Sequence, residues 1–286
     1  MSNPQITQIT QKKYVESIQS AEGLEFVIIK RIAILADIHG NLIALDNVLK
    51  DIEVSGGVEE YWLLGDYASI GPDPIGVLDR LTALVNTRFI RGNTDRYLVE
   101  DGQPWPQLSD AERDPELLSL AFRIARSFAW TTGAVGATGW LPWLAELPLE
   151  MRLILPDGTR VLAIHSAPGT DDGFGIHPNL TDDELREHMT GVSADLILVG
   201  HTHAPFDRTI DQVRVVNPGS ISNPLPPDLR ASYAILIPDK TGYKIELKRV
   251  DFDKDAVTAA ARKVNHPAAE YIAQFMRGER KTDWME

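Results

Sequence analysis

Seven residues that can bind metal ions follow short apolar runs at five places in the chain. In chain order these residues are Asp37 and His39, Asp66, Asn93, His165, and His201 and His203. Carboxylate, amide and imidazole groups are hard or borderline ligands for divalent metals. A single Asp-x-His or Gly-Asp is common turn or cap chemistry, but four of the seven histidines fall in this set. The pattern therefore predicts a metal site assembled from five loops.

The runs that lead to the first of these residues alternate with helical stripes. Residues 31–36 are mostly aliphatic with no helical period, which predicts a strand buried on both faces. From Leu42 onward apolar residues recur at helical spacing, and Asn41 is a suitable N-cap. Residues 61–64 and 87–90 predict two more strands, with a second helical stripe between them. This alternation favours parallel βαβ units, in which ligands bind beyond the carboxyl ends of the strands.

The second half of the chain repeats the pattern of a strand followed by a polar residue. Residues 151–164 predict a hairpin that turns at residues 156–158 and ends at His165. Thr181 and Glu184 form a capping box ahead of a short helix. The remaining strands are expected at residues 196–199, 213–216, 233–237 and 243–250.

One long segment lacks strand signals. Residues 96–147 predict a helical insertion, with Asp114 and Pro115 as the N-cap and first residue of one helix. The expected divisions of the chain are a polar lead-in over residues 1–30, one domain with this insertion over 31–250, and a helical tail over 251–286.

At the polar positions the chain resembles the calcineurin-like metallophosphoesterases. The resemblance rests on the order and spacing of Asp37-Ile38-His39-Gly40-Asn41, Gly65-Asp66, Gly92-Asn93-Thr94-Asp95, His165 and Gly200-His201-Thr202-His203. Two further segments are similar to the small bacterial and archaeal phosphodiesterase-like branch: Gly71-Pro72-Asp73-Pro74 and Asn217-Pro218-Gly219-Ser220. The resemblance covers residues 31–237. It implies the α/β fold of that family, a four-layer sandwich of two mixed β-sheets flanked by helices.

The resemblance also implies two divalent metal ions that share Asp66. One would be held by Asp37, His39, Asp66 and His203, and the other by Asp66, Asn93, His165 and His201. Cations roughly 3.5–4 Å apart would activate a bridging hydroxide for in-line attack on a phosphoester. Imidazoles bind metals only when neutral, so metal affinity should fall as the pH drops. Manganese is the expected metal, and iron, zinc, cobalt or nickel suit the same ligands.

The resemblance leaves the leaving-group acid open. Many members have His where this chain has Thr94, and Asp95, which orients that His in them, is expected to be structural here. His177 is a candidate acid, with a solvated loop histidine as the alternative. Arg91 is a candidate substrate-binding cation, with a surface salt bridge as the alternative. The expected catalytic residues are thus Asp66, Asn93, Arg91 and His177.

Phosphodiester hydrolysis is the first interpretation of function. Serine/threonine phosphatases of the superfamily carry a phosphate-binding Arg in Gly-Asp-x-x-Asp-Arg-Gly, where residues 65–71 of this chain contain no Arg. A phosphomonoesterase or protein phosphatase is therefore the second interpretation. A non-catalytic binding scaffold is less favoured because all seven ligands are present. A purely structural metal site is also less favoured, because such sites are usually single and closed.

Composition limits the partners and the compartment. Lys and Arg total 28 against 41 Asp and Glu, a net charge of −13, which disfavours long nucleic acids and leaves a small phosphoester as the expected substrate. The absence of cysteine excludes disulfides and thiolate metal sites. The apolar stretch at residues 26–36 is too short to span a bilayer, and residues 1–19 lack the apolar core of a secretory signal. We expect a cytoplasmic protein without membrane association, and the sequence leaves its oligomeric state open.

Overall fold

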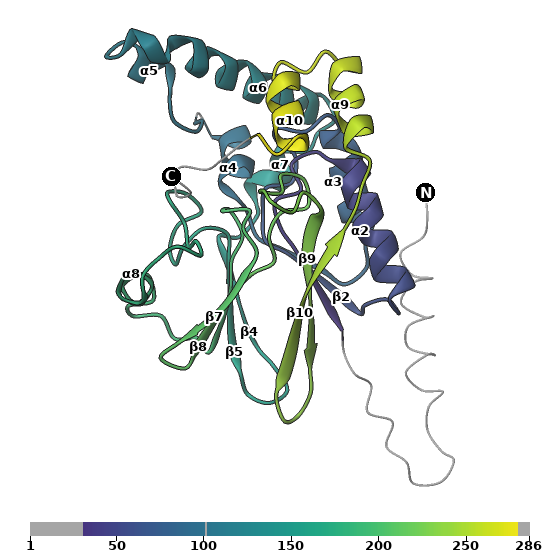
Figure 1. Ribbon diagram of the computed structural model, residues 1–286, viewed down its shortest axis with the longest axis vertical. Helices are drawn as coiled ribbons and strands as arrows, with labels where there is room; N and C mark the ends of the chain where they lie inside the picture. Colours follow the sequence, from purple (N-terminus) through teal and green to yellow (C-terminus); the bar gives the residue numbers. More distant parts are fainter. Residues whose placement is uncertain (1–30, 101, 280–286) are drawn as a thin grey trace.

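Two five-stranded mixed sheets face each other, and helices cover their outer faces (Figure 1). The computed structural model describes residues 31–100 and 102–279. The expected lead-in over residues 1–30 and the last residues of the expected tail lie outside this range. The predicted α/β four-layer sandwich is confirmed.

The first sheet has the strand order β10-β9-β1-β2-β3. Its strands are β1 (Ile32–Leu35), β2 (Glu60–Leu63), β3 (Thr87–Phe89), β9 (Ala231–Pro238) and β10 (Tyr243–Val250). The strands β1, β2 and β3 run parallel, as the βαβ pattern predicted, and β9 is antiparallel to β1 and β10. Asp37, Asp66 and Asn93 therefore leave the same edge of this sheet.

The second sheet has the order β4-β5-β6-β8-β7. Its strands are β4 (Glu150–Ile154), β5 (Arg160–Ile164), β6 (Leu196–Leu198), β7 (Phe206–Ile210) and β8 (Val213–Asn217). The central strands β5, β6 and β8 are parallel, while β4 and β7 are antiparallel edge strands. The sequence predictions missed β7. Its central residues Asp207, Arg208 and Thr209 are polar, because an edge strand has fewer neighbours to bury its side chains.

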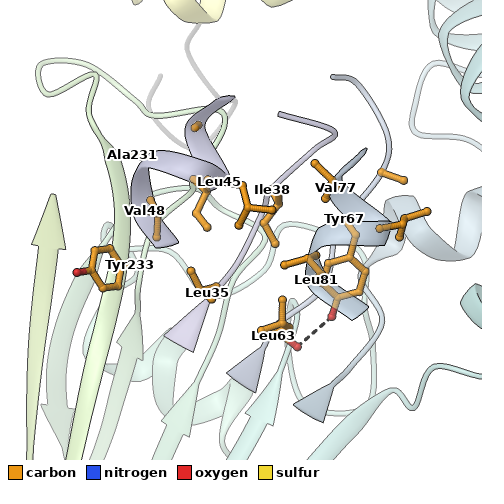
Figure 2. Packing of buried hydrophobic residues seen from close by; sticks show 14 of the residues in the cluster. Leu35, Ile38, Leu45, Val48, Leu63, Tyr67, Val77, Leu81, Ala231 and Tyr233 are labelled. Atoms are coloured by element: carbon orange, nitrogen blue, oxygen red, sulfur yellow. Dashed lines mark hydrogen bonds between the residues drawn. The ribbon is translucent and has the colours of Figure 1, made fainter. Parts of the chain in front are cut away.

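The two faces of β1 belong to two different hydrophobic clusters. Ala33 and Leu35 pack with the helices on the outside of the first sheet, whereas Ile32 and Ile34 pack against the second sheet. Figure 2 shows the outer cluster. A third cluster covers the far face of the second sheet. The prediction of a strand buried on both faces is confirmed, and each fully buried aliphatic side chain contributes about 1.5–3 kcal/mol.

Three helices flank the sheets, and two of them carry the expected caps. They are α2 (Leu42–Val54) and α3 (Pro74–Thr82) beside the first sheet, and α8 (Asp182–His188) beside the second (Figure 1). The Asn41 side chain accepts the Ala44 N–H at 3.0 Å, so the predicted N-cap of α2 is confirmed. The capping box of Thr181 and Glu184 is also confirmed.

The remaining helices gather beyond one end of the two sheets (Figure 1). Between β3 and β4 they are α4 (Asn93–Val99), α5 (Leu108–Ala111), the 3-10 helix η1 (Pro115–Leu117), α6 (Leu118–Ala137) and α7 (Leu141–Ala145). Asp114 caps η1, which continues directly into α6. After β10 the chain forms α9 (Lys254–Lys263) and α10 (Ala269–Met276). No helix among the described residues combines the length and apolar character needed to cross a bilayer.

Candidate metal centre

Five loops bring the seven predicted ligands together at the carboxyl ends of the parallel strands. Asp37 and His39 follow β1, Asp66 follows β2, Asn93 follows β3, His165 follows β5, and His201 and His203 follow β6. Neighbouring ligand atoms in the cluster lie 3.1–3.6 Å apart. Residues as far apart in sequence as Asp37 and His203 therefore meet in one place.

Asp37, His39 and His203 form the first group of candidate ligands, with ligand atoms all within 4.8 Å of one another. The His39 and His203 Nε2 atoms are 3.1 Å apart, and His203 Nε2 is 3.4 Å from Asp37 Oδ1. Two imidazole nitrogens bound at right angles to one cation at about 2.1 Å lie about 3.0 Å from each other. The separation of these nitrogens therefore fits ligation of a common metal ion.

Asn93, His165 and His201 form the second group. Asn93 Oδ1 lies 3.1 Å from His165 Nε2 and 3.2 Å from His201 Nδ1. These separations also match those between ligands of one cation. The donor set of imidazole nitrogens, carboxylates and one amide oxygen suits divalent transition metals.

Asp66 lies between the two groups. Its Oδ2 atom is 3.6 Å from His39 Nε2 and 3.5 Å from His165 Nε2. Its other oxygen, Oδ1, accepts the Thr94 N–H at 2.9 Å, which fixes the plane of the carboxylate. One oxygen is thus held by backbone, while the other faces both groups.

Five of the seven candidate ligands have a left-handed backbone. Their φ angles lie between 46° and 65°, at Asp37, His39, Asp66, His201 and His203. A non-glycine residue in this region costs roughly 1–2 kcal/mol. Backbone hydrogen bonds hold it in place, because the Ile38 and His39 N–H groups both donate to Asp66 O at 2.9 Å. Such strain concentrates at functional sites.

Glycine beside the candidate ligands allows the loops to approach closely. A Cβ atom on Gly92 would lie 2.1 Å from Asp66 Oδ1, and one on Gly65 would lie 2.4 Å from the Gly92 nitrogen. Any side chain at either position would separate the loops that carry Asp66 and Asn93. The Gly-Asp and Gly-Asn pairs of the sequence therefore have a steric origin.

Backbone carbonyls orient two of the imidazoles. His165 Nδ1 donates to Leu64 O at 2.6 Å, and His201 Nε2 donates to Gly173 O at 2.8 Å. With these nitrogens protonated, a neutral His165 offers a metal the lone pair of Nε2 and a neutral His201 that of Nδ1, and both atoms face Asn93. This is how metal-binding histidines are commonly held.

Asp95 supports the loops of the site, in keeping with the structural role expected from the sequence. It accepts three backbone N–H groups, from Asp66 at 2.7 Å, Tyr67 at 2.9 Å and Gly92 at 2.9 Å. Its side chain is fully buried, and burial together with the Asp66 carboxylate raises the pKa of Asp95 to about 7. The carboxylate therefore joins the loop after β2 to the loop after β3.

Three imidazoles of the cluster have shifted pKa values when no metal is bound. Burial lowers the pKa of His39 to about 4 and also lowers the pKa of His201, so both are neutral. Burial opposes charge on His165 too, but the Asp66 and Asp37 carboxylates outweigh it and raise the pKa of His165 to about 10. Burial would raise the pKa of Asp66, but the imidazoles of His165, His39 and His201 hold it well below its usual range.

Metal uptake is therefore expected to release the His165 proton between pH 6 and 8. Because the metal-free pKa of about 10 lies above this range, the association constant should rise about tenfold per pH unit. Calorimetry in buffers of different ionisation enthalpy counts the protons released, and His165→Gln should release one fewer than the wild type. Equal proton counts for the two proteins would contradict this assignment.

The structure places the other predicted site residues in less direct positions. Arg91 Nε donates to Asp171 at 2.7 Å, so the ion pair considered as its alternative role is present. Burial lowers the pKa of His177. Two charged groups of α8 also act on this pKa: Glu184 raises it and His188 lowers it. The catalytic roles of Arg91 and His177 stay predictions. The Thr94 hydroxyl is buried without a hydrogen-bond partner among the described residues.

Sequence reasoning did not identify four residues that surround the second group: Arg96, Tyr97, Asp171 and Asp172. They are linked by hydrogen bonds across 75 or 76 positions of sequence. The only local signal is the Gly- and Asp-rich composition of the loop after His165. Composition alone does not say which arginine each carboxylate will meet.

Comparison with known proteins finds, over most of the chain, the same family that the sequence motifs resemble. The model of the calcineurin-like phosphoesterase superfamily domain matches residues 31–241. An uncharacterised protein of Methanocaldococcus jannaschii is 28% identical over 239 residues, which cover 78% of this chain and 88% of that protein.

Two solved structures share the fold. A hypothetical protein from Pyrococcus horikoshii OT3 superposes with a TM-score of 0.71 at 22% identity, covering 87% of this chain and 98% of the other. A metallophosphoesterase from Sphaerobacter thermophilus superposes with a TM-score of 0.67 at 24% identity, covering 88% of this chain and 100% of the other.

Proposed function

The chain belongs to the calcineurin-like phosphoesterase superfamily, and we propose that it is a phosphodiesterase that uses two divalent metal ions, manganese first among them. The first ion would be held by Asp37, His39, Asp66 and His203. The second would be held by Asp66, Asn93, His165 and His201. This division follows the two groups of side chains described above.

The position of Asp66 is the observation that carries the proposal. A structural metal site needs one closed set of ligands. Here a single carboxylate oxygen lies within 3.6 Å of one imidazole from each group. Two cations close together repel, and a shared anion is what allows both to bind.

The charge of the site suits an anionic substrate despite the acidic chain. Asp37 and Asp66 are the two carboxylates of the ligand set, and the other five ligands are neutral when they bind a metal. Two dications would therefore leave the site with a net positive charge, inside a protein of net charge −13. When bound, the pair of metals would lower the pKa of a water between them and accept the phosphoryl oxygens.

The protein's own contribution is to orient the ligands. The carbonyls of Leu64 and Gly173 set the tautomers of His165 and His201. The Thr94 N–H fixes the Asp66 carboxylate. These contacts are in place without substrate, so little reorganisation is needed when a phosphoester binds.

A diester is favoured over a monoester by the lack of a free cation in the loop after β2. Ile70 stands where the protein phosphatases have their phosphate-binding Arg, and Ser69 beside it is buried. The nearby Arg91 is engaged by Asp171. A dianionic monoester gains more from an extra cation than a singly charged diester does.

Turnover of two aryl esters tests the proposal. With manganese added, kcat/KM for bis(p-nitrophenyl) phosphate should exceed that for p-nitrophenyl phosphate by about tenfold or more, roughly 1.4 kcal/mol of transition-state binding. The reverse order would identify a phosphomonoesterase. Bound metal with no turnover of either ester would point to a binding scaffold.

A further inference from the structure

A buried carboxylate ties the loop after His165 to the segment that carries Asn93. Asp171 is 3% exposed and accepts hydrogen bonds from Arg91 Nε at 2.7 Å and Arg96 Nε at 2.9 Å. A buried charge is retained only when it is well paired. The two arginines stand on either side of Asn93 in the chain, one before it and one after it. Asp171 thus holds both flanks of this candidate ligand.

The neighbouring Asp172 reaches Asn93 itself through a tyrosine. Its Oδ2 accepts Arg96 Nη2 at 2.8 Å and the Tyr97 hydroxyl. The Asn93 side chain acts on the same Tyr97 hydroxyl and lowers its pKa, as an amide N–H group facing that oxygen does. Because that hydroxyl donates to Asp172, it accepts from the Asn93 amide nitrogen. This contact turns Asn93 Oδ1 toward His165 and His201.

The same loop orients His201. Asp172 O accepts the Ser166 hydroxyl at 2.9 Å, and Asp172 Oδ1 accepts the Gly173 N–H at 2.8 Å. Gly173 O in turn accepts His201 Nε2 at 2.8 Å. Ser166 directly follows His165 in the chain. All three members of the second group are therefore within one or two contacts of the two aspartates.

The first group is held by a different part of the chain. Asp37 O accepts the Ser220 hydroxyl at 2.8 Å and the Ser222 N–H at 3.1 Å, both from the loop after β8. His39 N–H is bonded to Asp66 O. The Asp37 carboxylate also accepts the His201 N–H at 3.1 Å, so the two groups share this one backbone contact. The contacts of Asp171 and Asp172, by contrast, reach only the segments that carry the second group.

We propose that Asp171 and Asp172, with Arg91, Arg96 and Tyr97, are positioning residues for one of the two metal ions. This set, the loop network, holds Asn93, His165 and His201 at the separations that one cation requires. It sets the affinity of the second ion and leaves that of the first nearly unchanged. The inference rests on the proposed function, because it presupposes that two ions bind.

Manganese titration of two variants tests the inference. Asp171→Asn keeps the size of the side chain and removes the charge that two arginines share. Tyr97→Phe removes only the hydroxyl that orients Asn93. In each variant the second Mn²⁺ should bind about 10- to 100-fold more weakly, the usual cost of losing a contact behind a metal ligand. The first Mn²⁺ should bind within about twofold of the wild type.

Calorimetry gives the two affinities, and electron paramagnetic resonance shows whether two Mn²⁺ ions are coupled within one chain. Both readouts are independent of turnover. Asp195→Asn is the matched control, because Asp195 pairs with Arg160 at 2.7 Å at the opposite end of β5 from His165. The control should keep both affinities.

The outcomes separate the inference from the function on which it rests. A wild type that binds no pair of ions would overturn the proposed function. If the wild type binds two ions, the variants test the inference alone. Unchanged affinity for both ions in both variants, or an equal loss of both ions, would overturn it. If Asp171→Asn does not fold, Tyr97→Phe decides the question by the same criteria.

Discussion

Replacement of Asp66 by Asn is expected to lower kcat/KM for a phosphodiester by at least about 10³-fold, more than the 10²–10³ cost of losing one electrostatic contact to a transition state. Metal content should fall from two ions per chain to one or none. Asn has the shape of Asp but no charge, and a neutral amide cannot offset the repulsion of two cations. Asp66 Oδ2 is the atom that lies between the two groups.

The same variant should fold normally. The Thr94 N–H that Asp66 Oδ1 accepts at 2.9 Å can be accepted equally well by an amide oxygen. Metal content by mass spectrometry and turnover, measured on protein with an unchanged circular dichroism spectrum, test the prediction. A variant that keeps two ions and its activity would show that Asp66 does not bridge.

Replacement of Asp95 by Asn is expected to destabilise the metal-free chain by roughly 1–3 kcal/mol, since a buried N–H group left without an acceptor costs about that much. Both oxygens of Asp95 accept backbone N–H groups: Oδ2 those of Asp66 and Gly92, and Oδ1 that of Tyr67. An Asn side chain has one oxygen, so in either orientation its amide faces a donor. Urea denaturation measures the loss.

The matched control for Asp95 is Asp73. Asp73 caps α3 by accepting the Gly76 N–H at 2.8 Å, and it makes this contact through one oxygen. Asn caps helices as well as Asp does, so Asp73→Asn should change stability by less than about 0.5 kcal/mol. Equal losses of unfolding free energy at the two positions would mean that Asp95 stabilises the chain no more than a carboxylate with one backbone contact.

The positions of the candidate ligands were predictable because they depend on short-range rules. Apolar runs such as residues 31–36 predicted the central strands, and the carboxyl ends of parallel strands meet at one edge. Caps at Asn41 and Thr181 were predictable for a similar reason, since each bonds to a backbone group three residues away.

What the sequence did not predict depends on contacts between distant segments. Asp171 and Arg91 are 80 positions apart, and no local pattern pairs them. Strand β7 is recognisable only from its partner β8, because its polar residues do not alternate with enough apolar ones. The surroundings of His177 depend on how the loop after His165 meets α8, and composition does not determine that.

Anomalous diffraction from crystals grown with manganese tests most directly whether two ions share Asp66. The account predicts two anomalous peaks roughly 3.5–4 Å apart, one on each side of Asp66 Oδ2. One peak should be ligated by Asp37, His39 and His203, and the other by Asn93, His165 and His201. A single peak, or none at these seven side chains, in crystals of protein that hydrolyses phosphodiesters would contradict the account.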